Sequence, residues 1–317
     1  MIVSIVGSGS IGLGWAIVFS RAGHTVKICD VDQARLEFFW TELNERLFSL
    51  AESDLLHESP ETITSRISTT LDIAEAVEGA MYIQECATEK IDVKRSLLET
   101  LERVASQGSI IASSSSALKV STFANGLASR ERCMIVHPGN PPYLLNVCEI
   151  VPADFTDPNK VRIAREFLES CGLQTILVKK EIDGFVFNRL QGAILREAYC
   201  LVRDGVVDPI DIDVVMTEGL GKRWAILGPF GTSALNVEGG IRAHAARMAD
   251  SYYQMGLERG EDDPWTPELI NAVAEGVEPT FPNKDWSSNV RKRDKALMEI
   301  TKLSKESRFF KFYSSIK

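Results

Sequence analysis

One histidine of the sequence stands near an acid in a pattern suited to proton transfer. His137 follows the apolar run Met134–Val136 and enters a proline-rich turn, and a second apolar run beyond the turn carries Glu149. If the two runs pair as antiparallel strands, position 137 lies opposite 148, and Glu149 is within side-chain reach of the imidazole. A histidine near a turn is more often structural than catalytic. A carboxylate that holds one imidazole tautomer nevertheless predicts a general base with an orienting acid.

A glycine-rich segment near the amino terminus has the spacing of a dinucleotide-binding turn. The motif Gly7-Ser8-Gly9-Ser10-Ile11-Gly12 follows an apolar run and opens a helical pattern. Gly7 permits the tight turn, Gly9 lets a pyrophosphate approach the backbone, and Gly12 allows close packing of helix on strand. The phosphates would rest on N–H groups at the helix start, where Ser10 and Ile11 stand. The alternative is a glycine-rich turn before an ordinary core helix.

An acid at the end of the next apolar run strengthens the dinucleotide interpretation. Asp30 follows the glycines by about 20 residues, where a carboxylate can bind the 2′-hydroxyl of a ribose. A carboxylate there also repels a 2′-phosphate, so the sequence predicts NAD rather than NADP. Arg35 is a mild counter-signal, because an arginine nearby can hold that phosphate.

These residues need a scaffold, and the first part of the chain predicts a parallel sheet. Short apolar or β-branched runs alternate with helical patterns up to about Val178, which is typical of βαβ units. Helices are expected from Ser10, Asp32, Ile73, Glu89 and Asp157, with the two aspartates as caps. The predicted strands are Ile2–Val6, Thr25–Cys29, Met81–Glu85, Ser109–Ala112, Met134–Val136, Val147–Val151 and Thr175–Val178.

After Lys180 the alternation gives way to long amphipathic segments without a convincing strand. Helices are expected over residues 182–204, 208–219, 231–256, 266–276 and 284–304. We therefore predict an α/β fold, with a Rossmann-type, mostly parallel sheet in residues 1–181 and an all-helical domain in residues 182–317.

Composition and charge exclude several classes of function. The 317 residues are 44% hydrophobic and 25% charged, the usual mix of a globular protein. A net charge of −9 disfavours nucleic acid and anionic membranes as partners. Glycines interrupt the uncharged run before Arg21 and no basic region precedes it, so we expect a cytoplasmic protein rather than a secreted or anchored one. The six cysteines are scattered singly, and no metal site is predicted.

The order of the motifs resembles the 3-hydroxyacyl-CoA dehydrogenase superfamily. Two further stretches, Ile83-Gln84-Glu85-Cys86 and Glu218–Gly221 with Arg223, are closer to its lambda-crystallin or L-gulonate 3-dehydrogenase branch. The resemblance covers nearly the whole chain. It implies NAD-dependent oxidation of a 3-hydroxy acid and a helical domain that forms a homodimer. The ordered motifs are the glycine turn, Ser113–Ser116, His137-Pro-x-Asn140-Pro, Glu149 and Gly184-Phe-x-x-Asn188-Arg189.

The resemblance also implies roles for single residues. It makes His137 the general base and Glu149 its partner, with Ser116 and Asn188 bonded to the reacting oxygen or an adjacent carbonyl. Without the resemblance, a helix-capping serine and a solvent-facing asparagine are equally good interpretations of the last two.

Three more positions follow from the same comparison of motifs. Glu89 and Lys94 match positions that contact the dinucleotide in the lambda-crystallin branch, although an acid and a lysine at this spacing can also form a hydrated helix face. Gly139 departs from the family pattern, because relatives commonly carry a larger apolar residue there. The added backbone freedom of a glycine would loosen the turn after His137.

The stretch after the second strand bears on the substrate. In acyl-CoA relatives it offers basic side chains to the coenzyme A phosphates, whereas an acidic surface here disfavours such a phosphate tail. We therefore expect a small free 3-hydroxy acid similar to L-gulonate. Arg223 is the candidate for its carboxylate, the alternative being a surface or inter-domain salt bridge. Residues 42–66 contain Glu45, Glu52, Asp54, Glu58 and Glu61 against only Arg46 and Arg66.

Two competing functions remain. One is a 3-hydroxyacyl-CoA or carnitine-type dehydrogenase that uses the same catalytic residues. The other is a non-catalytic structural protein, as lambda-crystallin is in the lens. A scaffold does not need Ser116, His137, Glu149 and Asn188, so the intact set favours an enzyme.

Overall fold

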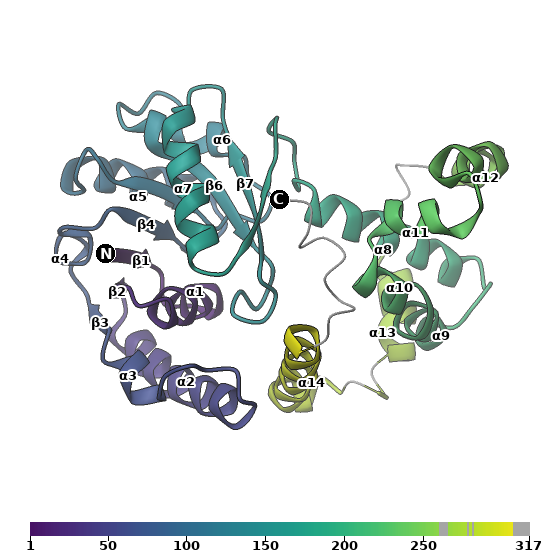
Figure 1. Cartoon of the computed structure of the whole chain (residues 1–317), viewed down its shortest axis with the longest axis horizontal. Helices are drawn as coiled ribbons and strands as arrows, with labels where there is room; N and C mark the ends of the chain where they lie inside the picture. The colour runs from purple at the N-terminus through teal and green to yellow at the C-terminus, as the bar shows by residue number, and fades with distance from the viewer. Residues whose placement is uncertain (260–265, 278, 281, 307–317) are drawn as a thin grey trace. The chain divides into compact units, whose positions relative to one another are not determined.

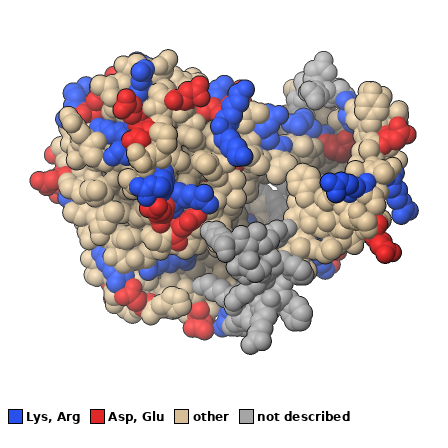
Figure 2. Space-filling model, turned by 45° about the horizontal axis from the view of Figure 1, so that its top comes forward, with Lys and Arg blue, Asp and Glu red and all other residues tan. Residues whose placement is uncertain are grey.

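A computed structural model describes residues 1–317 except for 260–265, 278, 281 and 307–317 (Figure 1). The chain divides into two compact units, Met1–Arg189 and Leu190–Lys317. The division falls inside a helix, whereas the sequence pattern places a boundary between residues 181 and 182. Acidic and basic side chains lie interspersed on the face of the molecule that Figure 2 shows. Among the described residues, no helix combines the length and the hydropathy that a bilayer span requires.

The first unit is built on one eight-stranded sheet with the order β3-β2-β1-β4-β5-β6-β7-β8. Every neighbouring pair is parallel except β6 and β7, which are antiparallel. The order reverses beside β1, where open parallel sheets bind ligands. The strands are β1 Ile2–Val6, β2 Thr25–Cys29, β3 Ile67–Thr70, β4 Tyr82–Glu85, β5 Ile110–Ser113, β6 Cys133–Pro138, β7 Val147–Pro152 and β8 Gln174–Leu177.

Seven helices connect these strands and lie on both sides of the sheet (Figure 1). The two predicted caps are confirmed, because the carboxylates of Asp32 and Asp157 accept hydrogen bonds from the second helical N–H at 2.9 and 2.8 Å. The helices are α1 Ser10–Arg21, α2 Gln33–Glu52, α3 Pro60–Thr64, α4 Ile73–Val77, α5 Ile91–Val104, α6 Val120–Ala124 and α7 Pro158–Ser170.

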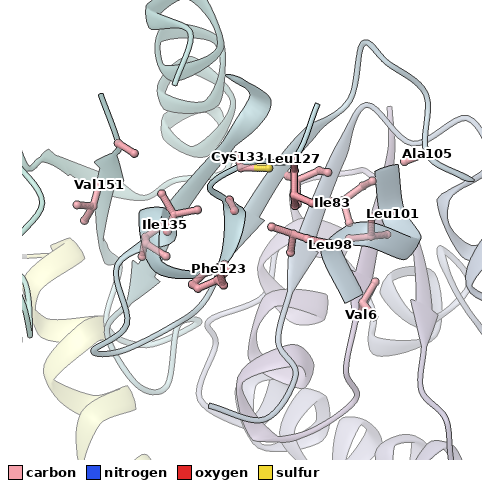
Figure 3. Packing of buried hydrophobic residues seen from close by; sticks show 14 of the residues in the cluster. Val6, Ile83, Leu98, Leu101, Ala105, Phe123, Leu127, Cys133, Ile135 and Val151 are labelled. Atoms are coloured by element: carbon pink, nitrogen blue, oxygen red, sulfur yellow. The ribbon is translucent and has the colours of Figure 1, made fainter. Parts of the chain in front are cut away.

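Central strands buried on both faces account for the continuous apolar runs in the sequence. On one face, side chains of α5 and α6 pack onto those of the strands in a single cluster (Figure 3). Leu98 and Leu101 come from α5 and Phe123 from α6, and they meet Ile83 of β4 and Ile135 of β6. This packing fixes the strand ends from which the candidate site residues project.

The predicted α/β class is confirmed, with a few elements missed. Each predicted strand is present, β1 and β2 with the predicted ends and the others with ends shifted by one or two residues, whereas β3 was not predicted. That strand lies at the sheet edge and buries only its first residue, Ile67, so its sequence lacks an apolar run. The helices α3 and α6 were missed as well; each has only five residues and so shows little helical period, although α4, which is equally short, was predicted from Ile73.

The second unit is helical, and no strand occurs in the part of it that the structure describes. The predicted long helix 231–256 is wrong, because the chain breaks at Gly239 and Gly240, which have φ of +93° and +67°. The first helix begins at Phe187 and not at 182. The elements are α8 Phe187–Arg203, which begins in the first unit, α9 Pro209–Val214, the π-helix η2 Val215–Leu220, α10 Gly221–Ile226, α11 Pro229–Asn236, α12 Gly240–Leu257, α13 Pro267–Val277, the 3₁₀ turn η3 Asn283–Asp285 and α14 Trp286–Glu306.

Candidate active site

Most of the predicted site residues gather at one edge of the sheet. Because β1, β4, β5 and β6 run parallel, their carboxyl ends lie at the same edge. The glycine turn follows β1, Glu89 and Lys94 follow β4, the serine run follows β5, and His137 stands near the end of β6. The topology therefore brings the two predicted sites together at the edge where ligands bind in such sheets.

His137 and Glu149 form a buried pair across β6 and β7. The two residues are register partners, and Nδ1 of the imidazole lies 2.8 Å from Oε2 of the carboxylate. His137 is 8% exposed and Glu149 is 3% exposed. The predicted reach between them is confirmed, but the register is off by one, since Pro138 and not His137 faces Cys148. The pairing is centred on Tyr143, which is half a residue further along the chain than the predicted centre.

The second oxygen of Glu149 is held by backbone. Oε1 accepts hydrogen bonds from the N–H groups of Val186 at 2.7 Å and Phe187 at 3.0 Å. Burial by itself raises the pKa of Glu149, but the hydrogen bonds from His137 and from these two N–H groups outweigh it, and the pKa lies below its ordinary value. An ionised carboxylate only accepts hydrogen bonds, so Nδ1 of His137 carries the proton of this hydrogen bond and Nε2 takes no part in it.

The turn between β6 and β7 is tightly packed rather than loose. A Cβ atom on Gly139 would lie 2.9 Å from Cβ of Leu145 and 3.2 Å from its carbonyl oxygen. The glycine therefore permits close approach within the turn, and the expected loosening is wrong. On the other side, a Cβ atom on Gly14 of α1 would lie 2.6 Å from Cδ of Pro142. The turn that carries His137 thus rests against the helix that follows the glycine motif.

The glycine motif has the geometry of a dinucleotide-binding turn. Gly7 has φ +108°, and a Cβ atom on it would lie 2.6 Å from the carbonyl oxygen of Cys86. A Cβ atom on Gly12 would lie 1.9 Å from the carbonyl oxygen of Gly7. By contrast, nothing lies within 4 Å of a Cβ position on Gly9, which precedes α1 without a side-chain cap. Open space beside uncapped N–H groups, including those of Ser10 and Ile11, fits a pyrophosphate.

Asp30 lies beside this turn at the end of β2. Its Oδ2 accepts hydrogen bonds from the backbone N–H and the hydroxyl of Ser8 at 2.8 and 2.7 Å, and Oδ1 accepts one from Val31 N–H at 2.8 Å. The carboxylate therefore braces the glycine turn. Oδ1 accepts one of these three bonds and has a lone pair for a further one, so the geometry is compatible with the predicted ribose contact. Arg35 is exposed in the first turn of α2.

Glu89 and Lys94 belong to a charge network that the sequence only partly indicated, and in it Lys94 and Glu85 are buried whereas Glu89 is exposed. Nζ of Lys94 lies 3.0 Å from both carboxylate oxygens of Glu85 and 3.3 Å from Oε2 of Glu89. Since Lys94 is 1% exposed, a hydrated helix face is the wrong interpretation for it. Glu85 also accepts a hydrogen bond from the Ser113 hydroxyl. Glu85 was missed, although an acid at the end of an apolar strand was a signal.

Ser116 and Asn188 meet through the backbone. Nδ2 of Asn188 donates to the carbonyl oxygen of Ser116 at 2.7 Å, and Ser116 N–H donates to Glu89 at 2.9 Å. Neither simple alternative describes them: α6 begins at Val120 after Lys119, so Ser116 caps no helix, and Asn188 is partly buried.

Arg223 lies in the second unit. Its guanidinium donates a hydrogen bond to the amide oxygen of Asn236 in α11. Within the described residues this partner is an amide and not a carboxylate, so the salt-bridge alternative is not what the structure contains.

A glycine turn of this type beside a held imidazole defines a Rossmann-type dehydrogenase. The chain matches the model of the 3-hydroxyacyl-CoA dehydrogenase NAD-binding domain over residues 2–182 and that of the C-terminal domain over residues 184–277. It therefore belongs to the 3-hydroxyacyl-CoA dehydrogenase family. The expected cofactor, NAD, is confirmed by this match, and the protein is an NAD-dependent oxidoreductase of this family.

Relatives match almost end to end. The chain is 36% identical to lambda-crystallin of Oryctolagus cuniculus over 312 residues, or 96% of each chain. It is 34% identical to L-carnitine dehydrogenase of Streptomyces coelicolor over 314 residues, or 94% of this chain and 93% of the other. A solved NAD⁺-dependent dismutase, 5-formyl-3-hydroxy-2-methylpyridine 4-carboxylic acid 5-dehydrogenase, superposes with a TM-score of 0.83 at 26% identity, over 97% of this chain and 99% of that one.

Gly9 and Gly12 should respond differently to the same substitution. We expect Gly9→Ala to fold like the wild type and to bind NAD at least tenfold more weakly, because the added methyl group enters only the open space beside the turn. Gly12→Ala should be destabilised, since its methyl group meets backbone. Thermal unfolding and calorimetric NAD titration measure both. Wild-type affinity in Gly9→Ala would contradict the cofactor site.

Glu149→Gln should lower stability in a pH-dependent way. The lowered pKa of Glu149 stabilises the folded protein above the pKa of the unfolded chain, and this contribution is lost as the pH falls through the folded-state pKa. We expect Glu149→Gln to cost about 1–3 kcal/mol of unfolding free energy at pH 7. The difference from the wild type should shrink below about pH 4.3. Urea unfolding at pH 7 and pH 4 tests this, and a difference that grows in acid would contradict it.

Proposed function

We propose that the protein oxidises the 3-hydroxyl of a small free 3-hydroxy acid, similar to L-gulonate, to the 3-keto acid, with His137 as the general base. The observation that carries the proposal is the hydrogen bond between Nδ1 of His137 and the ionised Glu149, which leaves Nε2 available to a substrate. NAD, when bound, accepts the hydride from the carbinol carbon. His137 takes the hydroxyl proton on Nε2, and Glu149 stabilises the imidazolium that results.

Two residues are proposed to hold the reacting oxygen. The amide of Asn188 has two N–H donors, and one of them is used on the carbonyl oxygen of Ser116. The second N–H is available for the substrate oxygen or an adjacent carbonyl. The side chain of Ser116 is exposed, so its hydroxyl can serve the same purpose. The proposed dinucleotide contacts are the glycine turn, Asp30, Glu89 and Lys94.

The charge balance of residues 42–66 supports a substrate without a nucleotide tail. Arg46 pairs with Glu42 at 3.1 Å, and Arg66 forms two hydrogen bonds of 2.6 Å with Glu58. Both arginines of this stretch are thus neutralised by carboxylates, and the remaining charges are acidic. A phosphate-rich coenzyme A tail gains little from such a surface. We propose that Arg223 in the second unit binds the substrate carboxylate instead.

The alternatives come from the relatives. One relative is named for carnitine, the family is named for acyl-CoA substrates, and lambda-crystallin carries the name of a lens protein. The buried pair of His137 and Glu149 favours an enzyme over a scaffold. A protein with a purely structural role could bury apolar residues at these positions with a smaller loss of hydration free energy.

A substrate panel with a His137 variant tests the proposed activity. Wild-type protein and NAD are mixed with L-gulonate, 3-hydroxybutyrate, carnitine and 3-hydroxybutyryl-CoA, and NADH is followed by absorbance. We expect turnover of a free acid in preference to the thioester. In His137→Ala, the rate should fall by about 10²- to 10⁴-fold with unchanged circular dichroism. If His137→Ala were as active as the wild type, His137 would not be the general base. A preference for the thioester would contradict the proposal of a free-acid substrate.

We also propose a homodimer formed through the helical unit. The elements α9, η2, α10, α11 and α12 contain no buried residue, although they are rich in apolar side chains. One hollow of about 840 Å³ is lined by Ile194, Leu201, Val215, Leu220 and Tyr252 among others. Monomers rarely leave an apolar surface of this extent in water. A second copy of the same chain is the partner that the family resemblance implies.

The oligomeric state tests the dimer. Sedimentation velocity should give twice the chain mass for the wild type. The double substitution Val215→Lys and Leu220→Lys should shift the protein to monomer, because lysine ammonium groups are costly to bury in an apolar interface. Phe48→Lys is the matched control, since Phe48 is an exposed apolar residue of α2 in the first unit. A monomeric wild type would contradict the proposal.

A further inference from the structure

The turn that leads into α8 contains a conformation that its sequence does not favour. Gly184 has φ +73° and the next residue, Phe185, has φ +49°. Glycine adopts the left-handed region readily, whereas a bulky side chain there is a genuine outlier. Such residues persist only where the surroundings compensate for the strain, and they are concentrated at functional sites.

The side chain of Phe185 provides that compensation. It is 0% exposed and belongs to the same buried cluster as Ile135 of β6 and Val151 of β7. Its ring centroid lies 5.8 Å from that of His137. The ring therefore packs in the hydrophobic core and also lies next to the imidazole. A glycine would adopt this backbone conformation more readily, so the phenyl ring is what position 185 contributes.

The consequence of the turn appears in the two residues that follow it. The N–H groups of Val186 and Phe187 both point at Oε1 of Glu149, at 2.7 and 3.0 Å. Two consecutive N–H groups that converge on one oxygen form an anion-binding concavity, and here a left-handed turn directly precedes them at the start of α8. This turn is the left-handed pair Gly184 and Phe185, and the buried ring holds it in place.

We propose that Phe185 is a positioning residue, whose buried ring anchors the turn that fixes Glu149 and, through Glu149, the orientation of His137. For its catalytic consequence this inference rests on the proposed function. The effect of Phe185 on Glu149 and His137 can be measured on the full-length protein without substrate. The inference about Phe185 and the proposed function can therefore fail separately.

The first test observes the Nδ1 proton of His137 by NMR, with the signal assigned by its loss in His137→Ala. In the wild type this proton should resonate far downfield, because it is donated to a carboxylate. Phe185→Leu should move the signal upfield or lose it to exchange with water. Phe123→Leu is the matched control, because it makes the same change in the same buried cluster and should leave the signal in place. An unchanged signal in Phe185→Leu overturns the proposal.

The second test separates the ring from the backbone. Glycine in place of alanine normally lowers the melting temperature, but at a left-handed position the order reverses. We expect Phe185→Gly to melt at or above Phe185→Ala, and both to melt below the wild type. An ordinary order, with Phe185→Ala the more stable of the two, would show that the backbone is not held in the left-handed region.

The third test is kinetic. With the hydroxy acid that the substrate panel identifies, Phe185→Leu should lower kcat by up to about 100-fold and change KM little, because misplacement of the base acts on the chemical step. Phe123→Leu should keep kcat within a few-fold of the wild type. Equal kcat values in the two variants would overturn the role of Phe185. If the wild type oxidises none of the acids, the proposed function fails, while the NMR comparison still decides what Phe185 does.

Discussion

The structure depends on one carboxylate whose two oxygens accept hydrogen bonds from different parts of the chain. Oε2 of Glu149 holds the imidazole of His137, and Oε1 holds the backbone that leads into α8. Because these hydrogen bonds outweigh the effect of burial on its pKa, Glu149 is the acceptor for every donor around it. The tautomer of His137 therefore follows from the ionisation of Glu149, and the same carboxylate accepts the two N–H groups at the start of α8.

The β6–β7 hairpin makes this arrangement possible. In a sheet that is otherwise parallel, only this pair allows two residues close in sequence to face each other across neighbouring strands. The turn between them packs against α1 through Gly14 and Pro142. Since α1 begins at the glycine motif, the same helix positions the proposed phosphate contacts at one end and supports the turn after His137 further along. The two halves of the site are thus linked by packing.

A second charge network lies at the end of β4, where Lys94 and Glu85 are buried and Glu89 is exposed. Lys94 lies between Glu85 and Glu89, and Glu89 in turn accepts hydrogen bonds from the loop that contains Ser116. Buried ion pairs contribute little net stability, since the loss of hydration offsets the attraction of the charges. What this network provides is a fixed geometry. It connects the strand ends with the loop whose carbonyl oxygen receives the amide of Asn188.

The sequence by itself determined the fold class, the family and the residue types of the site, because period, glycine spacing and strand-end acids are local signals. It placed Glu149 within reach of His137, since a hairpin joins residues that are near in sequence. It could not give the register, which depends on how the turn closes around Tyr143, nor the burial of Lys94. The contact of Glu149 with backbone N–H groups could not be predicted from the sequence either. Val186 and Phe187 lie far along the chain, and only the packing of Phe185 into the core brings their N–H groups to the carboxylate.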